Sequence, residues 1–302
     1  MKRLLIVTEH LPPAFHFDLF EPRRGTEKFY LYTAKEAASA GFAVDVEMDG
    51  GLTNCGGVIN TAPRRTDRPF YDKILVCNPR RVDPTIGKSY STDVIVWHDF
   101  HLGTDPAAYA PLFEIAKGFG SPDLTVISEY SRSLHGPGRN VRVVPLGIDR
   151  NVYHPQPNTA RKKRVVFTSS PDRGLKALAA LWRERQIADR TGYELWTSAY
   201  AAGNYTDRDV AEVLATSEFW IHPGEGNELF CLAAVEAQAC GATPLVVPNG
   251  ALAETVKYGY CFTPESFLDG VEAVLSGEAF LPGVNADHIK DWETVTRELL
   301  RL

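Results

Sequence analysis

The chain has 302 residues, and a typical domain length of about 150 residues suggests two domains. Its 32 basic and 38 acidic side chains leave a net charge of −6, which argues against nucleic-acid binding through overall positive charge. No run approaches the roughly 18 apolar residues of a membrane span, so any membrane contact should be peripheral. Five scattered cysteines without metal-ligand spacing indicate a reducing compartment, and we expect a cytoplasmic protein.

Short apolar runs alternate with helical patterns along the chain. In the first series the runs occupy residues 3–8, 42–48, 73–78, 93–98, 124–128 and 141–147, and a helix is expected at 25–41. The second series has runs at 164–170, 193–199, 218–223 and 243–248, and helices at 175–188, 206–217, 232–241, 252–259 and 266–277. This alternation is typical of β-α-β units and parallel sheets.

The two series are separated by residues 148–164, where Pro155, Pro157 and a basic run interrupt the pattern. We therefore predict an α/β fold with two Rossmann-like, doubly wound domains that meet near residue 150 and face each other across a cleft, where such folds bind ligands. Only Gly25 stands near the first helix, and the absence of G-x-G-x-x-G disfavours a dinucleotide-dependent hydride transferase.

Two carboxylates, Glu228 and Glu236, flank the expected start of a helix. The first free N–H groups of that helix are expected near Leu229, Phe230 and Cys231, and such groups bind anions. A carboxylate, an anion site and a second carboxylate suit a ligand with hydroxyls at both ends and phosphates between, such as a nucleotide sugar. The pair taken alone favours two solvated acids on an amphipathic helix, because Glu is a common helix former.

Residues 222–256, HPGEGNELFCLAAVEAQACGATPLVVPNGALAETV, resemble the E-x7-E segment of the retaining glycosyltransferases of family 4, which have the glycosyltransferase B fold. Other segments follow in the family's order: a first glycine loop and helix at 23–46, an interdomain segment at 141–155, a phosphate-binding turn at 169–178 and a terminal helix at 291–300. The resemblance implies an N-terminal acceptor-side domain over 1–149, a nucleotide-sugar domain over 150–284, and a helix over 285–302 that crosses back to the first domain.

The resemblance also implies roles for the donor-binding residues. Glu228 would contact the donor sugar and Glu236 the nucleotide ribose. Arg173, placed before a glycine where the family has a lysine, would bind the diphosphate through its planar fork. The family's further arginine is replaced by Phe167, and Lys176 is a candidate substitute.

On the acceptor side, the resemblance maps the family's active-site histidine to His98, beside Asp99, with His101 as the alternative. A structural His–Asp pair would give the same pattern. Gly25 would let the backbone approach the donor or the acceptor. Cys231 stands where the family often has glycine, so its side chain is expected to crowd the diphosphate.

The reaction that the resemblance implies is sugar transfer from a nucleotide-diphosphate donor to an acceptor hydroxyl, with retained anomeric configuration. Arg173, Lys176 and the helix start at Leu229 and Phe230 would stabilise the leaving diphosphate. The scheme needs no metal and no cofactor besides the donor substrate. The donor's base and sugar, the acceptor (glycan, lipid, small molecule or DNA) and the oligomeric state stay open.

Other interpretations remain. Asp207 and Asp209 would suit a metal-dependent glycosyltransferase, although Thr206 followed by acids is also typical of a helix N-terminus. A nucleotide-sugar epimerase or a phosphorylase has the same architecture, and fold does not fix reaction. From another functional class, a non-catalytic nucleotide-sugar-binding protein is favoured by the departures at Phe167 and Cys231.

Overall fold

The computed structural model describes residues 1–8, 25–48, 59–63, 70–77, 93–97, 123–135, 140–157, 159–197, 205–278 and 286–302. The described residues form two compact units. Those before Ile148, together with Trp292–Leu302, make the first unit, and Ile148–Asp291 make the second.

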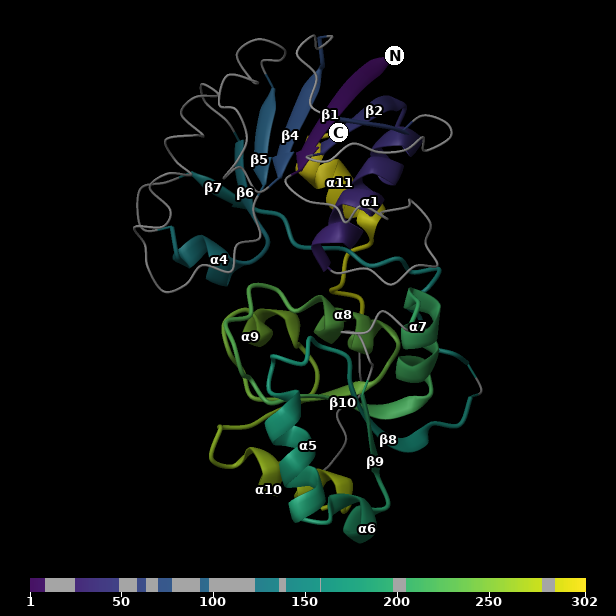
Figure 1. Ribbon diagram of the computed structural model, residues 1–302, viewed down its shortest axis with the longest axis vertical. Coiled ribbons are helices and arrows are strands. Elements are labelled where there is room, and N and C mark those ends of the chain that lie inside the picture. Colours follow the sequence, from purple (N-terminus) through teal and green to yellow (C-terminus); the bar gives the residue numbers. More distant parts are fainter. Residues whose placement is uncertain are drawn as a thin grey trace. The chain divides into compact units, whose positions relative to one another are not determined.

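The first unit is built on a parallel sheet with strand order β3-β2-β1-β4-β5-β6-β7 (Figure 1). Its strands are β1 (Lys2–Thr8), β2 (Phe42–Met48), β3 (Ile59–Pro63), β4 (Lys73–Cys77), β5 (Val94–Trp97), β6 (Asp123–Val126) and β7 (Val141–Val143). Its described helices are α1 (Gly25–Ser39), α4 (Glu129–Ser133) and α11 (Trp292–Leu300). Residues 4–7 of β1 are all buried, as expected for a central parallel strand that is covered on both faces.

The C-terminal helix α11 packs against α1 within the first unit. The ring of Trp292 stacks on Tyr32 with a centroid distance of 5.3 Å and meets Phe29 edge-on at 6.3 Å. Arg142 of β7 donates hydrogen bonds to the carbonyls of Glu298 (2.7 Å) and Leu299 (3.0 Å). A cation on the last free carbonyls of a helix stabilises that end, so β7 and α11 hold each other in place.

The second unit contains a parallel sheet with strand order β12-β11-β10-β8-β9. Its strands are β8 (Lys162–Phe167), β9 (Glu194–Thr197), β10 (Ser217–His222), β11 (Thr243–Val246) and β12 (Tyr260–Cys261). Its described helices are α5 (Leu175–Glu184), α6 (Ile187–Thr191), α7 (Asp207–Ala215), α8 (Leu232–Ala239), α9 (Leu252–Thr255) and α10 (Phe267–Leu275). Helices α5, α6 and α10 lie on one face of the sheet, and α7, α8 and α9 lie on the other (Figure 1).

The core of the second unit explains the departure at position 167. Phe167 is fully buried in an apolar cluster with Ile221 of β10, Leu178 of α5 and Val271 of α10. Its side chain therefore packs between the sheet and the helices of one face. An arginine there would bury an unpaired charge, so Phe167 is a core residue of this chain.

Among the described residues, no helix combines the length and apolar character that crossing a membrane would require.

Candidate functional site

The candidate site lies at the carboxyl ends of β8 and β10. These strands pair directly, with Phe219 opposite Val165 and Trp220 opposite Val166, yet the strands that follow them lie on opposite sides of the pair. The loop over 168–174 leaves β8 toward α5, and the loop over 223–231 leaves β10 toward α8. In doubly wound sheets ligands bind at such a switch point, where adjacent loops diverge.

Arg173 is positioned by a tight turn between β8 and α5. Its N–H donates to the carbonyl of Ser170 at 2.9 Å, and Gly174 follows with φ of 93° as the N-cap of α5. A Cβ at Gly174 would lie 2.7 Å from Pro223 Cγ and 2.9 Å from Glu225 Cδ. The two loops therefore touch at a point where only glycine fits.

Arg173 forms an ion pair with Glu228 in which Nε and Oε1 are 3.3 Å apart. Only 13% of the arginine side chain and 11% of the glutamate side chain are exposed. The guanidinium also lies against Gly226, because a Cβ at that residue would be 2.2 Å from Nη1. The structure thus brings together two residues that are 55 positions apart, and Arg173 is not an ordinary surface arginine.

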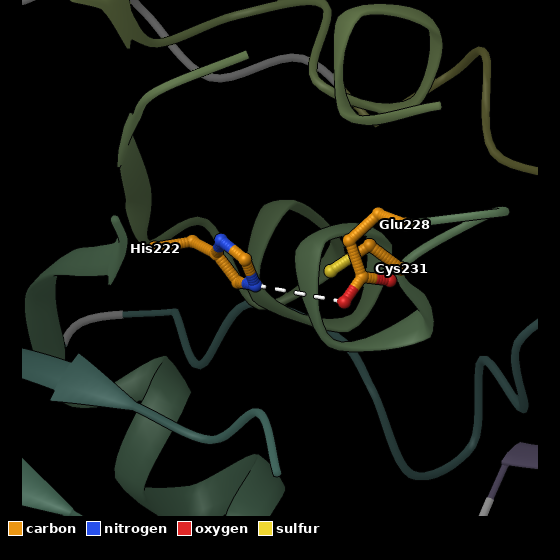
Figure 2. Close-up of side chains that lie close together, drawn as sticks. All are labelled: His222, Glu228 and Cys231. Atoms are coloured by element: carbon orange, nitrogen blue, oxygen red, sulfur yellow. Dashed lines mark ion pairs between the residues drawn. The ribbon is translucent and has the colours of Figure 1, made fainter. Parts of the chain in front are cut away.

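His222 ends β10 and is fully buried behind the same carboxylate. Its Nδ1 lies 3.0 Å from the backbone nitrogen of Gly224, whose N–H can only donate. Nδ1 is therefore the acceptor, and the proton of the neutral ring is on Nε2. Nε2 is 3.7 Å from Oε1 of Glu228, along the dashed line in Figure 2.

The loop that carries Glu228 is held by the segment after β11. Asn249 donates from Nδ2 to the carbonyl of Gly224 at 2.8 Å and to that of Gly226. The N–H of Ala251 donates to the carbonyl of Glu228 at 2.8 Å. Because its carbonyls are tied at three points, the loop presents Glu228 in one defined position.

Helix α8 begins at Leu232, where the sequence pattern placed the start of the helix over 232–241. Leu229 and Phe230 are buried in a bend, Cys231 is the N-cap, and the first helical residue is Leu232. The N-cap is thus the last of the three residues near which free N–H groups were expected, and an anion site at Leu229 and Phe230 stays a prediction. Cys231 has φ of 62°, a left-handed conformation that favours glycine, so the helix cannot extend backwards through it.

The side chains of His222, Glu228 and Cys231 gather within 4.8 Å of one another (Figure 2). A divalent metal would need a free ring nitrogen and a thiolate. However, Nε2 of His222 carries the ring proton, and Glu228 already faces Arg173. Burial, and next the charge of Glu228, raise the pKa of Cys231 well above its ordinary value. The arrangement therefore favours a cation-paired carboxylate over a metal site.

Two further candidates in the second unit differ in their surroundings. Glu236 lies one turn inside α8 and is 4% exposed. Burial, and next the Glu236 charge, raise the pKa of Cys240. Lys176 is the second residue of α5 and is exposed, and the described residues include no hydrogen-bond or ion-pair partner for it. The structure thus joins Glu228 with Arg173 but does not bring Lys176 into that pair.

Two sequence candidates belong to the first unit. His98, like its neighbour Asp99 and the alternative His101, lies outside the described residues. Gly25 is the first residue of α1.

The acidic pair Asp207 and Asp209 serves a helix N-terminus. Thr206 is the N-cap of α7, and its hydroxyl accepts the N–H of Asp209 at 3.2 Å. The Asp209 carboxylate accepts the N–H of Thr206 in return at 2.8 Å, which completes a capping box. The helix-cap interpretation of these acids is confirmed.

The sequence prediction missed His222 and Asn249. His222 follows an aromatic strand and resembles an ordinary core residue, whereas Asn249 lies in a Pro-Asn-Gly segment that is typical of any turn. A signal was present for His222, because the last residue of a strand at a switch point faces the ligand edge of the sheet.

Comparisons with known proteins relate the chain to sugar transferases. No known family profile matches it. It is 28% identical over 172 residues to a GDP-mannose-dependent alpha-(1-6)-phosphatidylinositol dimannoside mannosyltransferase of Mycobacterium tuberculosis, and the match spans 45% of this chain and 44% of that protein. The chain thus aligns with less than half the length of this relative.

Solved structures match over the whole chain. Sucrose-phosphate synthase from Thermosynechococcus elongatus matches with a TM-score of 0.65 and 15% identity, over 100% of this chain and 94% of that one. HepE from Anabaena in complex with UDP and glucose matches with a TM-score of 0.60 and 15% identity, over 100% and 99% of the two chains. The chain therefore has the glycosyltransferase B fold predicted from its sequence, and it resembles the retaining glycosyltransferases that share this fold.

Proposed function

We propose that the protein transfers a sugar from a nucleotide-diphosphate sugar to an acceptor hydroxyl with retention of anomeric configuration. The observation that carries the proposal is the Arg173–Glu228 pair at the switch point of the second unit, directly before helix α8. The similarity to a GDP-mannose-dependent mannosyltransferase, and to a structure that holds UDP and glucose, supports it.

The role that we propose for each residue follows from the chemistry of the donor. Arg173 offers a guanidinium fork that suits a diphosphate, and the first N–H groups of α8 add positive potential nearby. Glu228 accepts hydrogen bonds from sugar hydroxyls. Glu236, one turn further along α8, accepts those of the ribose. As the bond between the anomeric carbon and the diphosphate breaks, charge develops on the phosphate oxygens, where a fixed cation lowers the barrier.

Arg173 and Glu228 neutralise each other in the structure. This pairing prevents an isolated charge from being buried beside Gly226, which would be costly. A diphosphate that binds Arg173 must compete with the carboxylate, and it brings more negative charge than Glu228 does. The pair therefore keeps the site ordered before the donor arrives.

The acceptor side of the proposal rests on the resemblance. His98 is proposed as the active-site histidine, and Gly25 as the point where the backbone approaches the ligands. The acceptor stays open, and a lipid acceptor would place the protein at the cytoplasmic surface of a membrane.

A second candidate function is non-catalytic binding of a nucleotide sugar, and Cys231 favours it. Its side chain occupies the N-cap of α8, where a glycine would leave room for phosphate. Hydrolysis of the donor without added acceptor separates the two candidates, because a transferase loses donor slowly to water and a pure binder leaves it intact.

Thermal unfolding with UDP-, GDP-, ADP- and TDP-sugars tests the proposal. A donor present at about a hundred times its dissociation constant should add about 2.7 kcal/mol of stability. Arg173→Ala and Glu236→Ala should abolish the shift, whereas Arg183→Ala, which removes an exposed arginine from α5, should retain it. A folded protein that shows no shift with any nucleotide sugar would refute the proposed function.

A further inference from the structure

His222 is a buried polar residue, and the proposed reaction assigns it no role. Its side chain is fully buried at the end of β10, between the rings of Phe167 (centroid distance 6.3 Å) and Trp220 (5.8 Å). Burying an imidazole has an energetic cost unless its nitrogens find partners, and an apolar residue would pack here without that cost. The groups that its ring nitrogens face should therefore explain why a histidine, and not an apolar residue, occupies this position.

The two ring nitrogens of His222 have different surroundings. Nδ1 accepts the N–H of Gly224 at 3.0 Å, so the ring cannot rotate without breaking a backbone hydrogen bond. Nε2 is buried and has no hydrogen-bond partner within the part of the chain that the structure describes. The bond at Nδ1 thus both places the proton on Nε2 and directs that N–H toward Glu228 (Figure 2).

Arg173 and His222 approach the same oxygen of Glu228. Nε of the arginine is 3.3 Å from Oε1, and Nε2 of the histidine is 3.7 Å from it. No described residue forms a hydrogen bond or ion pair with the second oxygen, Oε2. A carboxylate held through one oxygen leaves the other for a ligand.

We propose that His222 is a positioning residue that takes over Oε1 of Glu228 when Arg173 turns to the donor diphosphate. The inference rests on the proposed function. Without a second donor, Glu228 would lose the one cation that pairs with it among the described residues at the moment it must hold the sugar. A movement of about 0.5 Å by the carboxylate would bring the 3.7 Å contact to hydrogen-bond length. The ring cannot follow Arg173 to the phosphate, because Gly224 anchors it.

Two substitutions separate the contact that Nδ1 of His222 makes with Gly224 from the contact that Nε2 makes with Glu228. His222→Asn keeps a short side chain that can accept the Gly224 N–H but cannot reach Glu228. His222→Gln reaches as far as Nε2 and can donate to the carboxylate. If His222 acts through Glu228, the glutamine should recover most of the function that the asparagine loses. A purely structural role would instead favour the variant that keeps the Gly224 bond.

Calorimetric titration with UDP, UDP-glucose, GDP and GDP-mannose provides the readout. Glu228 is proposed to contact the sugar, so His222→Asn should weaken binding of the preferred nucleotide sugar about tenfold. The same variant should bind the matching nucleoside diphosphate as the wild type does, because Arg173 and α8 are intact. The His222→Asn change should have no further effect in a Glu228→Ala background, which lacks the oxygen that accepts the Nε2–H. Equal weakening for diphosphate and sugar nucleotide, or additive effects of the two substitutions, would overturn the inference.

The contact itself is measured without any ligand. Urea unfolding of His222→Asn, Glu228→Ala and the double variant gives the coupling between the two side chains. We expect the double variant to be more stable than the two single effects predict by addition. If the stability losses of the two single variants add up to the loss of the double variant, the two side chains are not coupled and the inference fails. Failure of the wild type to bind any of the four nucleotides would refute the proposed function instead, so the two failures are distinguishable.

Discussion

Replacing Gly226 by alanine tests whether Arg173 must lie against the loop that carries Glu228. Gly226 has φ of 80°, and a Cβ there would lie 2.2 Å from Nη1 of Arg173. Ordinary contacts begin at 3.4 Å, so the guanidinium must move by about 1 Å. Such a movement separates Arg173 from Glu228, which are 3.3 Å apart at their closest atoms.

Gly277→Ala is a matched control in the same unit. Gly277 has φ of 79° at the end of α10, and a Cβ there would meet nothing within 4 Å. The two alanines therefore share the left-handed backbone strain, about 1 kcal/mol of unfolding free energy. Only the alanine at Gly226 also displaces a charged hydrogen-bond donor, which adds about 1–2 kcal/mol.

Urea unfolding and donor titration measure the two effects. Gly226→Ala should lose about 2–3 kcal/mol of stability and Gly277→Ala about 1 kcal/mol. Donor affinity should fall about tenfold in the first variant and stay unchanged in the second. Equal losses of stability together with equal donor affinities would show that the position of Arg173 does not depend on this glycine.

Three further changes test the surroundings of the site. Cys231→Gly should be about 1 kcal/mol more stable to urea than Cys231→Ala, because both lose the thiol and only glycine relieves the left-handed φ of 62°; a more stable alanine variant would contradict this. Arg161→Ala should lower the unfolding free energy by about 2 kcal/mol, because its guanidinium donates to two backbone carbonyls at 2.6 and 2.9 Å; a loss no larger than that of Arg183→Ala would argue against the contribution. Thr206→Ala should lose about 1 kcal/mol at neutral pH. Hydrogen bonds from Thr206 lower the pKa of Asp209, so the part of this loss that comes from the carboxylate is present above the carboxyl's unfolded pKa and disappears as pH falls through its folded pKa. A loss that is undiminished in strong acid would contradict the carboxylate half of the capping box.

The fold class was predictable because its signal is local. Each buried parallel strand appears as a short apolar run, and each covering helix as an apolar stripe at helical spacing. The run at residues 4–7 is central in the first sheet, and the run around Phe219 is central in the second. The capping box at Thr206 was also local, since its two partners are three residues apart.

The candidate site was predictable only in part. Glu228 and Arg173 could be selected from their motifs, and the structure brings them together. The start of α8 at Leu232 was predicted, but the left-handed conformation of the preceding Cys231 was not, because it depends on how the loop is tied to Asn249 and Ala251. The position of Lys176 was equally undetermined, since a shift of one residue on a helix turns a side chain by about 100°.

By itself the sequence determined the alternation of strands and helices, the presence of two such series, and the residues whose chemistry suits a nucleotide sugar. These properties depend on residues that are neighbours along the chain. Only the tertiary structure decided that the loops after β8 and β10 touch at Gly174, that Arg173 lies on Gly226, and that His222 points its N–H at Glu228. Such contacts depend on strand order and on distances of a few ångströms between residues that are far apart in the sequence, which no local pattern of residues specifies.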